Sequence, residues 1–506
     1  MGDDGRSADL PPSYSSVRLA SPRHPSSSPR TSTAARVPRR PVEHKFSLND
    51  SRSIPWATLT VISNAASSAY LPSFFEGQPI SGHFELNLSR PEAVQAIIIT
   101  VDGTIVATNA PHFTFWDYTQ TLWSNDMGDP RGPNASGSNY AGPSSSTSAL
   151  SQISLTKHQT KLNGSYCWPF SITLPPKCDI AMKSKQPPTP VRLPPSFSEK
   201  GAAQFINYEI NVRIRRGPLR IDSKVGTHFG YTPRMRPPAP SLLRRLSYQE
   251  GSALRGPEGD PDGWQSFPTI PIRGKVFGNR IIEAFCTFYI ALPLSYTRGT
   301  PIPCLLSVAC SDKQALDLVF TPASTSVHLF REVSYGADDT PASAGAGPSS
   351  ASGSSTSAYL RNPLSNATTS SPKQAPKLAL RKARTCVASA VWWTRRDNAS
   401  CDVDGEGRAR LRIEGELHIP KELPPSFVFG PFKMKYSLVM LPFFATAFEP
   451  INPADKEPVF LTNIEIATQH AYGSSPRSYA PPGHETQSAA HQQRVTKPMV
   501  WGLYNE

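Results

Sequence analysis

Charge, cysteine and long apolar runs are all scarce in this sequence of 506 residues. Charged residues make up 18%, against roughly 25% in an average soluble protein. The seven cysteines are scattered and form no Cys-x-x-Cys pair, which excludes a disulfide framework and a zinc ribbon. The longest apolar runs, residues 281–294 and 436–448, are shorter than the roughly 20 residues that a membrane-spanning helix requires.

Catalytic signatures are also missing. The sequence holds no glycine motif of a dinucleotide-binding turn, no Walker loop, no HExxH and no GxSxG. Residues 402–407 have the letters of a calcium loop, but Ile413 occupies the position of the bidentate glutamate and no helices flank the segment. We therefore expect a hairpin turn at this place, and a protein that is not an enzyme and has no metal or cofactor.

The first ten residues are polar and acidic and lack the apolar stretch of a secretory signal. We accordingly expect a cytoplasmic protein whose thiols stay reduced.

Proline is abundant, with 53 residues, about twice its usual share of roughly 5%. Because proline removes a backbone donor and breaks helix interiors, this excludes a long helical bundle or coiled coil. Short segments of period-two alternation appear instead, bounded by glycine, proline and asparagine. In one of them Phe84, Leu86 and Leu88 share a face, and in another Tyr208 and Ile210 do so. The pattern predicts an all-β protein built from two β-sandwiches.

Composition divides the chain into strand-rich blocks and connecting segments rich in serine, proline and glycine. We expect the latter to be disordered or to form long surface loops. The predicted organisation, in chain order, is a basic tail 1–45, a first sandwich 46–217 with an insert 126–151, a basic linker 218–262, a second sandwich 263–470 with an insert 336–372, and a loose tail 471–506.

Several strand motifs follow one another in a recognisable order. Tyr70 precedes the spacing Gly77-x-x-Ile80-x-Gly82, which opens an alternating strand. The motifs that follow it are residues 99–103, 168–175, 193–197 and 208–212. This succession resembles the amino-terminal domain of the arrestin family, in the version carried by fungal arrestin-related trafficking adaptors. The second block is similar to the arrestin carboxyl-terminal domain, with segments 298–303, 411–419 and 432–441 in matching places.

The sharpest local motif is Pro11-Pro12-Ser13-Tyr14, which matches the PPxY ligand of WW domains. Two prolines preset a polyproline II turn, and the tyrosine fills a neighbouring groove on the same side. The resemblance implies an adaptor that binds integral membrane cargo, such as transporters or receptors. Such an adaptor recruits a HECT-type ubiquitin ligase through PPxY and associates peripherally with the plasma membrane or endosomes.

Two internal segments, 193–197 and 423–427, both read Leu-Pro-Pro-Ser-Phe and resemble the tail motif with phenylalanine in place of tyrosine. We predict that both are connections from a loop into a sandwich strand rather than ligands.

The formal net charge is +13, and much of the excess lies in proline-rich stretches, including residues 213–245. Within that stretch, Arg244 and Arg245 precede Ser247 with the spacing of a basophilic kinase site. The charge leaves open a nucleic-acid-binding regulator, although charge in a linker is a weak sign of it and no nucleic acid is expected. A second alternative is a sorting scaffold of retromer type, which has the same double sandwich and needs no ligase.

Overall fold

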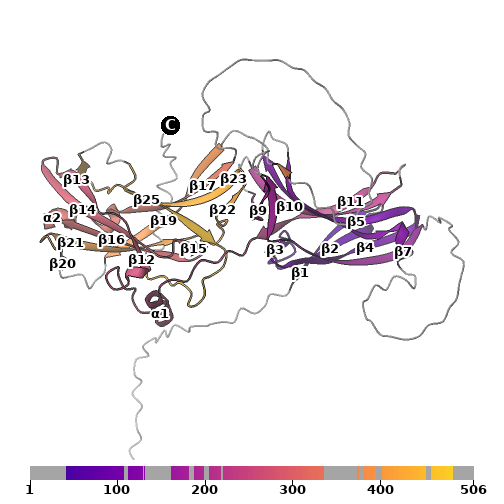
Figure 1. Cartoon of the computed structure of the whole chain (residues 1–506), viewed down its shortest axis with the longest axis horizontal. Coiled ribbons are helices and arrows are strands. Elements are labelled where there is room, and N and C mark those ends of the chain that lie inside the picture. Colours follow the sequence, from indigo (N-terminus) through magenta and orange to yellow (C-terminus); the bar gives the residue numbers. More distant parts are fainter. Residues whose placement is uncertain are drawn as a thin grey trace, which may run out of the picture. The chain divides into compact units, whose positions relative to one another are not determined.

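The computed structural model describes residues 41–107, 112–128, 130, 161–181, 187–198, 204–217, 220–335, 373–374, 381–394, 402–451 and 457–482. Strands account for nearly all of the regular structure (Figure 1), so the predicted all-β fold is confirmed. The helices within these ranges are α1 (Leu242–Glu250), α2 (Lys313–Val319) and the single turns η1 (Asn125–Met127), η2 (Pro261–Gly263) and η3 (Pro322–Ser324).

The first sandwich consists of two sheets. One sheet has the strand order β1 (Val42–Asn49), β2 (Pro55–Ser63), β4 (Pro79–Glu92) and β7 (Leu162–Thr173). The other has the order β3 (Ser73–Phe75), β11 (Ser223–Thr232), β10 (Gln204–Arg216), β5 (Val94–Ala107) and β6 (Phe113–Ser124). The indole rings of Trp123 in β6 and Trp168 in β7 lie 6.5 Å apart, and they join the two sheets through a shared core.

Period-two alternation produces this core as predicted. Along β4 the side chains of Phe84 and Leu86 are fully buried, whereas the alternating residues His83 and Glu85 are half-buried. Tyr208 and Ile210 in β10 are likewise inaccessible. Successive residues of a strand point to opposite faces, so each strand gives one apolar face to the space between the sheets.

The second sandwich is formed by one sheet that turns back on itself. Within the described residues its path is β15 (Ser295–Thr297), β25 (Phe460–Ala467), β23 (Phe432–Leu441), β17 (Ser326–Tyr335), β19 (Arg381–Thr394), β21 (Ala409–His418), β16 (Pro301–Cys310), β14 (Arg280–Ala291), β13 (Ile270–Val276) and β24 (Phe448–Pro450). The short strands β12 (Trp264–Ser266), β20 (Asp402–Val403) and β22 (Phe427–Phe429) pair with β14, β21 and β23.

Strand β19 makes the turn possible because its two halves belong to opposite layers. Its first half pairs with β17, and its end, from Ala390 to Thr394, pairs with β21. Phe288 of β14 lies 5.7 Å from Phe460 of β25, a contact between the two layers. The Trp392 and Trp393 side chains are buried at the end of β19, as expected for the edge of a sandwich core.

A small sheet of β18 (Lys373–Gln374), β8 (Lys177–Ala181) and β9 (Thr189–Arg192) accompanies the first sandwich. Its strand β8 supplies Ile180 to the core. Most of both predicted inserts, and the whole of residues 1–40, lie outside the described residues.

Three predicted boundaries need correction. The basic linker 218–262 contains strand β11, which pairs along its length with β10, and helix α1. Within the predicted loose tail, Tyr479 is hydrogen-bonded to Glu416 of the second sandwich and to Ser247 of α1. The first sandwich begins with β1 at Val42 rather than at residue 46. In each case a polar segment is ordered by long-range contacts that its local pattern does not reveal.

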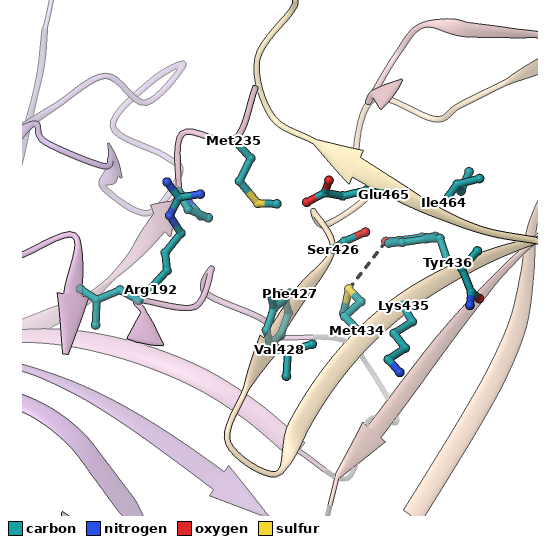
Figure 2. Close-up of a pocket in the computed structure, with 13 residues that line it drawn as sticks. Arg192, Met235, Ser426, Phe427, Val428, Met434, Lys435, Tyr436, Ile464 and Glu465 are labelled. Carbon is teal, nitrogen blue, oxygen red and sulfur yellow. Dashed lines mark hydrogen bonds between the residues drawn. The ribbon is translucent and has the colours of Figure 1, made fainter. Parts of the chain in front are cut away.

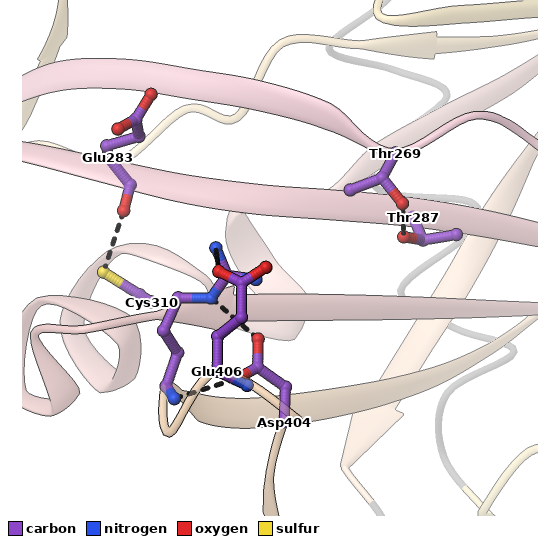
Figure 3. Close-up of polar contacts among 7 residues, drawn as sticks. Thr269, Glu283, Thr287, Cys310, Asp404 and Glu406 are labelled. Carbon is purple, nitrogen blue, oxygen red and sulfur yellow. Dashed lines mark hydrogen bonds and ion pairs between the residues drawn. The ribbon is translucent and has the colours of Figure 1, made fainter.

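The six cysteines at described positions are free thiols. Burial raises the pKa of Cys304 and Cys286 well above the ordinary value, because a thiolate would lose its hydration there. The Cys310 thiol donates to the backbone carbonyl of Glu283 at 3.4 Å, and the hydroxyls of Thr269 and Thr287 meet at 2.7 Å on the neighbouring strand (Figure 3). These hydrogen bonds join neighbouring segments of the second sandwich.

Candidate interaction site between the two sandwiches

The two Leu-Pro-Pro-Ser-Phe segments occupy equivalent places in the two sandwiches. In the first, the Tyr208 hydroxyl donates a hydrogen bond of 2.7 Å to the carbonyl of Pro194. In the second, the Tyr436 hydroxyl donates to the carbonyl of Pro424, also at 2.7 Å. Each diproline therefore has one carbonyl bound by a buried tyrosine of the adjacent strand.

The serine of each segment binds the second strand of a sheet, β11 or β25, in the same way. Ser196 donates its N–H to the Tyr231 carbonyl, and its Oγ accepts from the Tyr231 N–H. Ser426 makes the same pair of hydrogen bonds with Ile466, at 2.9 and 2.8 Å. The predicted role of both segments, a connection from loop to strand, is consistent with this geometry.

A second repeated element lies beside each segment. The sequence Ser-aromatic-x-x-Gly-x-Pro-Ile occurs at residues 73–80 and 295–302. Its first three residues form β3 or β15, each parallel to the strand that the serine binds. Gly77 and Gly299 then turn the chain with φ of 77° and 80°, a region where glycine has no steric penalty. Both sandwiches thus contain the same local unit, encoded twice in the sequence.

Aromatic rings connect the two units to each other. Phe197 ends the first Leu-Pro-Pro-Ser-Phe segment and lies 5.6 Å from Phe432 of β23. Phe427 ends the second and stacks on the same Phe432 ring at 5.2 Å. Phe115 of β6 adds a contact of 4.8 Å with Phe429. The fully buried Phe432 is therefore shared by both copies.

A pocket of about 410 Å³ lies next to this aromatic contact (Figure 2). From the first sandwich and the segment after it come Arg192, Leu193, Pro233 and Met235. The remaining lining comes from the second sandwich: Ser426, Phe427, Val428, Met434, Lys435, Tyr436, Asn463, Ile464 and Glu465.

The chemistry of this lining suits binding of a polypeptide segment. Met235, Met434 and Phe427 offer apolar contact, and methionine adapts readily to different partners. Arg192, Lys435 and Glu465 supply charges of both signs. Arg192 is also 3.7 Å from Glu76, which accepts from the Arg234 N–H and so anchors the segment that carries Met235. Within the described ranges no three His, Cys, Asp or Glu side chains are grouped so as to hold a metal ion.

Comparison with known protein families identifies the first sandwich. The arrestin (or S-antigen) N-terminal domain matches residues 69–230, from just before β3 to near the end of β11. These residues form an arrestin-type N-terminal domain. No curated protein matches the chain in the corresponding search. The matched segment contains the first copy of the repeated unit, and the second copy lies beyond it.

The arrestin match also indicates a general function. Arrestin-family proteins are generally non-catalytic adaptors, so this chain is arrestin-like in fold and adaptor-like in class. Among the described residues, no helix is both long enough and apolar enough to span a membrane.

The predicted WW ligand, Pro11, Pro12 and Tyr14, lies outside the described residues. The two related internal sequences are described, and their diprolines are integrated into the arrestin-like sandwiches. Pro194 and Pro195 are buried, and Pro425 is buried beside the half-buried Pro424. A WW domain stacks its aromatic rings on exposed prolines, so neither internal copy presents a ligand in the folded chain.

The predicted kinase site has a different environment from the one expected. Ser247 lies in helix α1 with only 5% of its surface exposed, and Arg244 is 3% exposed. The Arg244 guanidinium donates to the Leu292 carbonyl and lies over the Trp264 ring, while Arg245 is half-buried. A kinase binds an accessible, extended substrate, so this geometry argues against phosphorylation of Ser247 in the folded protein.

The basic stretch 213–245 does not form one continuous cationic stripe. Arg213 is 3.7 Å from Asp222, and Arg216 is 3.2 Å from Glu92. Buried Arg244 adds no charge to the surface. These pairings neutralise part of the charge that motivated a nucleic-acid-binding role.

Residues 402–407, whose sequence resembles a calcium loop, form the predicted hairpin turn between β20 and β21 (Figure 3). Asp404 accepts hydrogen bonds from the N–H groups of Arg408 and Glu406, and from the Arg408 guanidinium at 2.7 Å. The Arg408 N–H contributes most to holding the pKa of Asp404 below its ordinary value. The carboxylate therefore closes a turn.

Sequence reasoning missed the residues that line the pocket. Arg192, Met235 and Glu465 belong to segments far apart in the chain, and none is part of a local motif. The usable signal was the repeated unit itself, because the duplicate of residues 73–80 at 295–302 predicts a second parallel edge strand beside the second Leu-Pro-Pro-Ser-Phe.

Proposed function

We propose that this arrestin-like protein is a non-catalytic adaptor that binds integral membrane cargo and recruits a WW-domain HECT-type ubiquitin ligase through Pro11-Pro12-Ser13-Tyr14. The ligase then ubiquitinates the cargo and directs its endocytic trafficking. The observation that supports ligase recruitment is a contrast among three Pro-Pro-Ser sequences, at residues 11–13, 194–196 and 424–426. The last two are integrated into the sandwiches through tyrosine hydrogen bonds, and the first alone is followed by tyrosine.

Binding of the full-length chain to an isolated WW domain of a HECT-type ligase tests this role. Tyr14→Ala is expected to abolish capture, because the tyrosine fills one of the two grooves of the WW domain. Tyr70→Ala, a change at a tyrosine that is 66% exposed, is the control and should leave capture unchanged. Equal capture by the Tyr14→Ala variant and the parent would remove ligase recruitment from the function.

A second variant separates the motif from its place in the fold. Phe427→Tyr in the Tyr14→Ala chain recreates the letters PPSY at residues 424–427. This variant should not regain WW binding, since Pro425 is buried and the Pro424 carbonyl is bound by Tyr436.

Peripheral membrane association is supported by exposed apolar side chains in loops of the second sandwich. Phe277 in the β13–β14 turn is 71% exposed and has φ of 53°, a conformation uncommon for a bulky residue. Phe444 is 81% exposed, in the loop that precedes β24, and the Phe277 N–H donates to Ala447 of that same loop. Lys275 flanks the turn with an exposed ammonium group. Aromatic side chains beside cations suit the surface of an anionic membrane.

Cosedimentation with phosphatidylserine vesicles measures this association. The Phe277→Ser/Phe444→Ser double variant should bind several-fold less, because two aromatic side chains that insert into the lipid surface are lost. A matched pair at Ile54 and Tyr70, exposed residues of the first sandwich, is the control. Unchanged sedimentation of the Phe277/Phe444 variant would contradict membrane contact through these loops.

A further inference from the structure

Residues 468–482, termed here the C-terminal strap, are fastened at both ends. At the first end, Thr468 and Gln469 donate their N–H groups to the Met235 carbonyl, and the Arg236 guanidinium lies 3.9 Å over the Tyr472 ring. At the second end, Tyr479 stacks on Tyr248 of helix α1 with ring centroids 6.3 Å apart. Its hydroxyl donates to the Ser247 carbonyl at 3.1 Å.

The second fastening includes a buried carboxylate. Glu416 in β21 is only 1% exposed. One of its oxygens accepts from the Ser478 hydroxyl at 2.7 Å, and the other accepts from the Tyr479 N–H at 2.6 Å. His418 Nε2 lies 3.4 Å from the same carboxylate. A buried carboxylate is costly unless hydrogen bonds replace its water, so Glu416 and the strap stabilise each other.

Ser478 is accessible to solvent although its hydroxyl is hydrogen-bonded to the buried Glu416. The residue is exposed, as are its neighbours Ser475 and Arg477, and the segment around it forms neither helix nor strand. Its accessibility is the opposite of that of Ser247, which is 5% exposed within α1. A kinase can therefore reach Ser478 along a stretch of extended chain.

We propose that Ser478 is a phosphorylation site and that its modification releases the C-terminal strap from Glu416. A protein kinase transfers the γ-phosphoryl group of a nucleoside triphosphate to Ser478 Oγ. The new P–O bond forms as the bond to the departing nucleoside diphosphate breaks, and the hydroxyl proton passes to a base of the kinase.

Two effects of this step act in the same direction. The hydroxyl proton that Glu416 accepts is lost, and a phosphate of charge near −2 takes its place. Like charges in a site of low dielectric repel strongly. Tyr479 leaves its stack on Tyr248 as the strap detaches, which removes one wall of an existing cavity of about 160 Å³ lined by Trp264, Trp393 and Tyr479 among others.

This inference does not rest on the proposed recruitment of a ligase, since neither Tyr14 nor the WW domain enters the argument. Hydrogen exchange of the full chain gives the test, with the Tyr479 amide as the reporter. Ser478→Glu is expected to raise the exchange rate of this amide about tenfold or more, because it removes a charged hydrogen bond and adds repulsion from Glu416. Ser475→Glu is the matched control, placing the same charge three residues away, and should leave the rate unchanged.

Two further variants separate charge from the loss of a donor. Ser478→Ala removes only the hydroxyl and should raise the exchange rate less than Ser478→Glu does. In the Glu416→Gln chain the repulsion is absent, so adding Ser478→Glu should raise the rate by a smaller factor than in the parent. Equal rates for Ser478→Glu and Ser475→Glu would overturn the proposal. An effect of Ser478→Glu that does not exceed that of Ser478→Ala would overturn it as well.

Discussion

The two Leu-Pro-Pro-Ser-Phe segments have identical sequences and the same hydrogen bonds, but their surroundings differ. In the first copy Pro194, Pro195 and Phe197 are all buried, and Phe197 makes a single bridge to Ile206. In the second copy Pro424 and Phe427 are half-buried, and Phe427 continues into strand β22. The second copy contributes the half-buried Ser426 and Phe427 to the pocket, whereas the first contributes the buried Leu193.

This comparison separates what five residues determine locally from what the rest of the fold determines. The tyrosine and serine hydrogen bonds recur because the adjacent strand and the parallel edge strand recur. Burial does not recur, since it depends on what packs over the segment. The first copy is therefore expected to be a stability element, and the second to combine stability with a binding surface.

The largest expected effect follows from removing the ring that both copies share. Phe432→Ala should destabilise the chain by about 3–5 kcal/mol, because Phe432 is fully buried against Phe197 and Phe427. Phe427→Ala should cost about 1–2 kcal/mol, since that ring is only half-buried. Urea denaturation followed by tryptophan fluorescence measures both. Equal losses for the two variants would contradict a shared anchor at Phe432.

The next effect distinguishes the two tyrosine hydrogen bonds. Tyr208→Phe leaves the buried Pro194 carbonyl without its donor and should cost about 1–3 kcal/mol. Tyr436→Phe should cost about 1 kcal/mol, because Pro424 is half-buried and water can replace the hydroxyl. The same denaturation experiment compares them. A larger loss for Tyr436→Phe would reverse the assignment of the first copy as the more buried one.

Raising the pH above 10 should lower the stability of the chain through Tyr208, the tyrosine of the first copy. Burial raises the pKa of Tyr208 well above its ordinary value near 10. Below pH 10 the tyrosine is neutral in the folded and the unfolded state, so it adds no pH dependence to the free energy of unfolding. Above pH 10 the unfolded chain loses the proton that the folded chain keeps, so stability falls by about 1.4 kcal/mol per pH unit for this group.

Unfolding free energies at several pH values above 10 measure this slope. Tyr208→Phe should make the decline shallower by that amount per pH unit. An unchanged slope would show that Tyr208 ionises equally easily in both states.

The smallest expected effects concern the two turn glycines. Gly77→Ala should cost about 1 kcal/mol from the positive φ alone, since nothing lies within 4 Å of the added carbon. Gly299→Ala should cost slightly more, because the added carbon would meet Lys421 Cγ at 2.7 Å and displace that flexible side chain. Shifts in thermal unfolding temperature compare the pair. A stabilised Gly77→Ala variant would contradict the strained turn.

Much of the fold could be predicted from short-range patterns. The alternation of Phe84, Leu86 and Leu88 identified a half-buried strand because a pleated sheet has a period of two. Strand β11 was missed because Thr227 interrupts its apolar face of Val225, Phe229 and Tyr231, and because glycine, which occupies positions 226 and 230, is depleted in strands. Helix α1 had recognisable ends, with Ser241 capping the Arg244 N–H and Gly251 in the left-handed region.

The site was far less predictable than the sheets. The pocket is lined by residues as far apart in the chain as Arg192 and Glu465, and the strap depends on Glu416, 62 positions before Ser478. A single sequence contains no periodic signal for contacts of that range. The repeated unit at residues 73–80 and 295–302 was the available clue, because duplicated letters imply duplicated geometry.

Titration of the full-length chain with a purified WW domain in a calorimeter tests the central claim most directly. The comparison predicts one WW domain bound per chain, at Pro11-Pro12-Ser13-Tyr14, because the two internal Pro-Pro-Ser-Phe sequences are held within the sandwiches. It also predicts no binding after Tyr14→Ala. Two or three sites per chain, or undiminished binding by the Tyr14→Ala variant, would contradict the account.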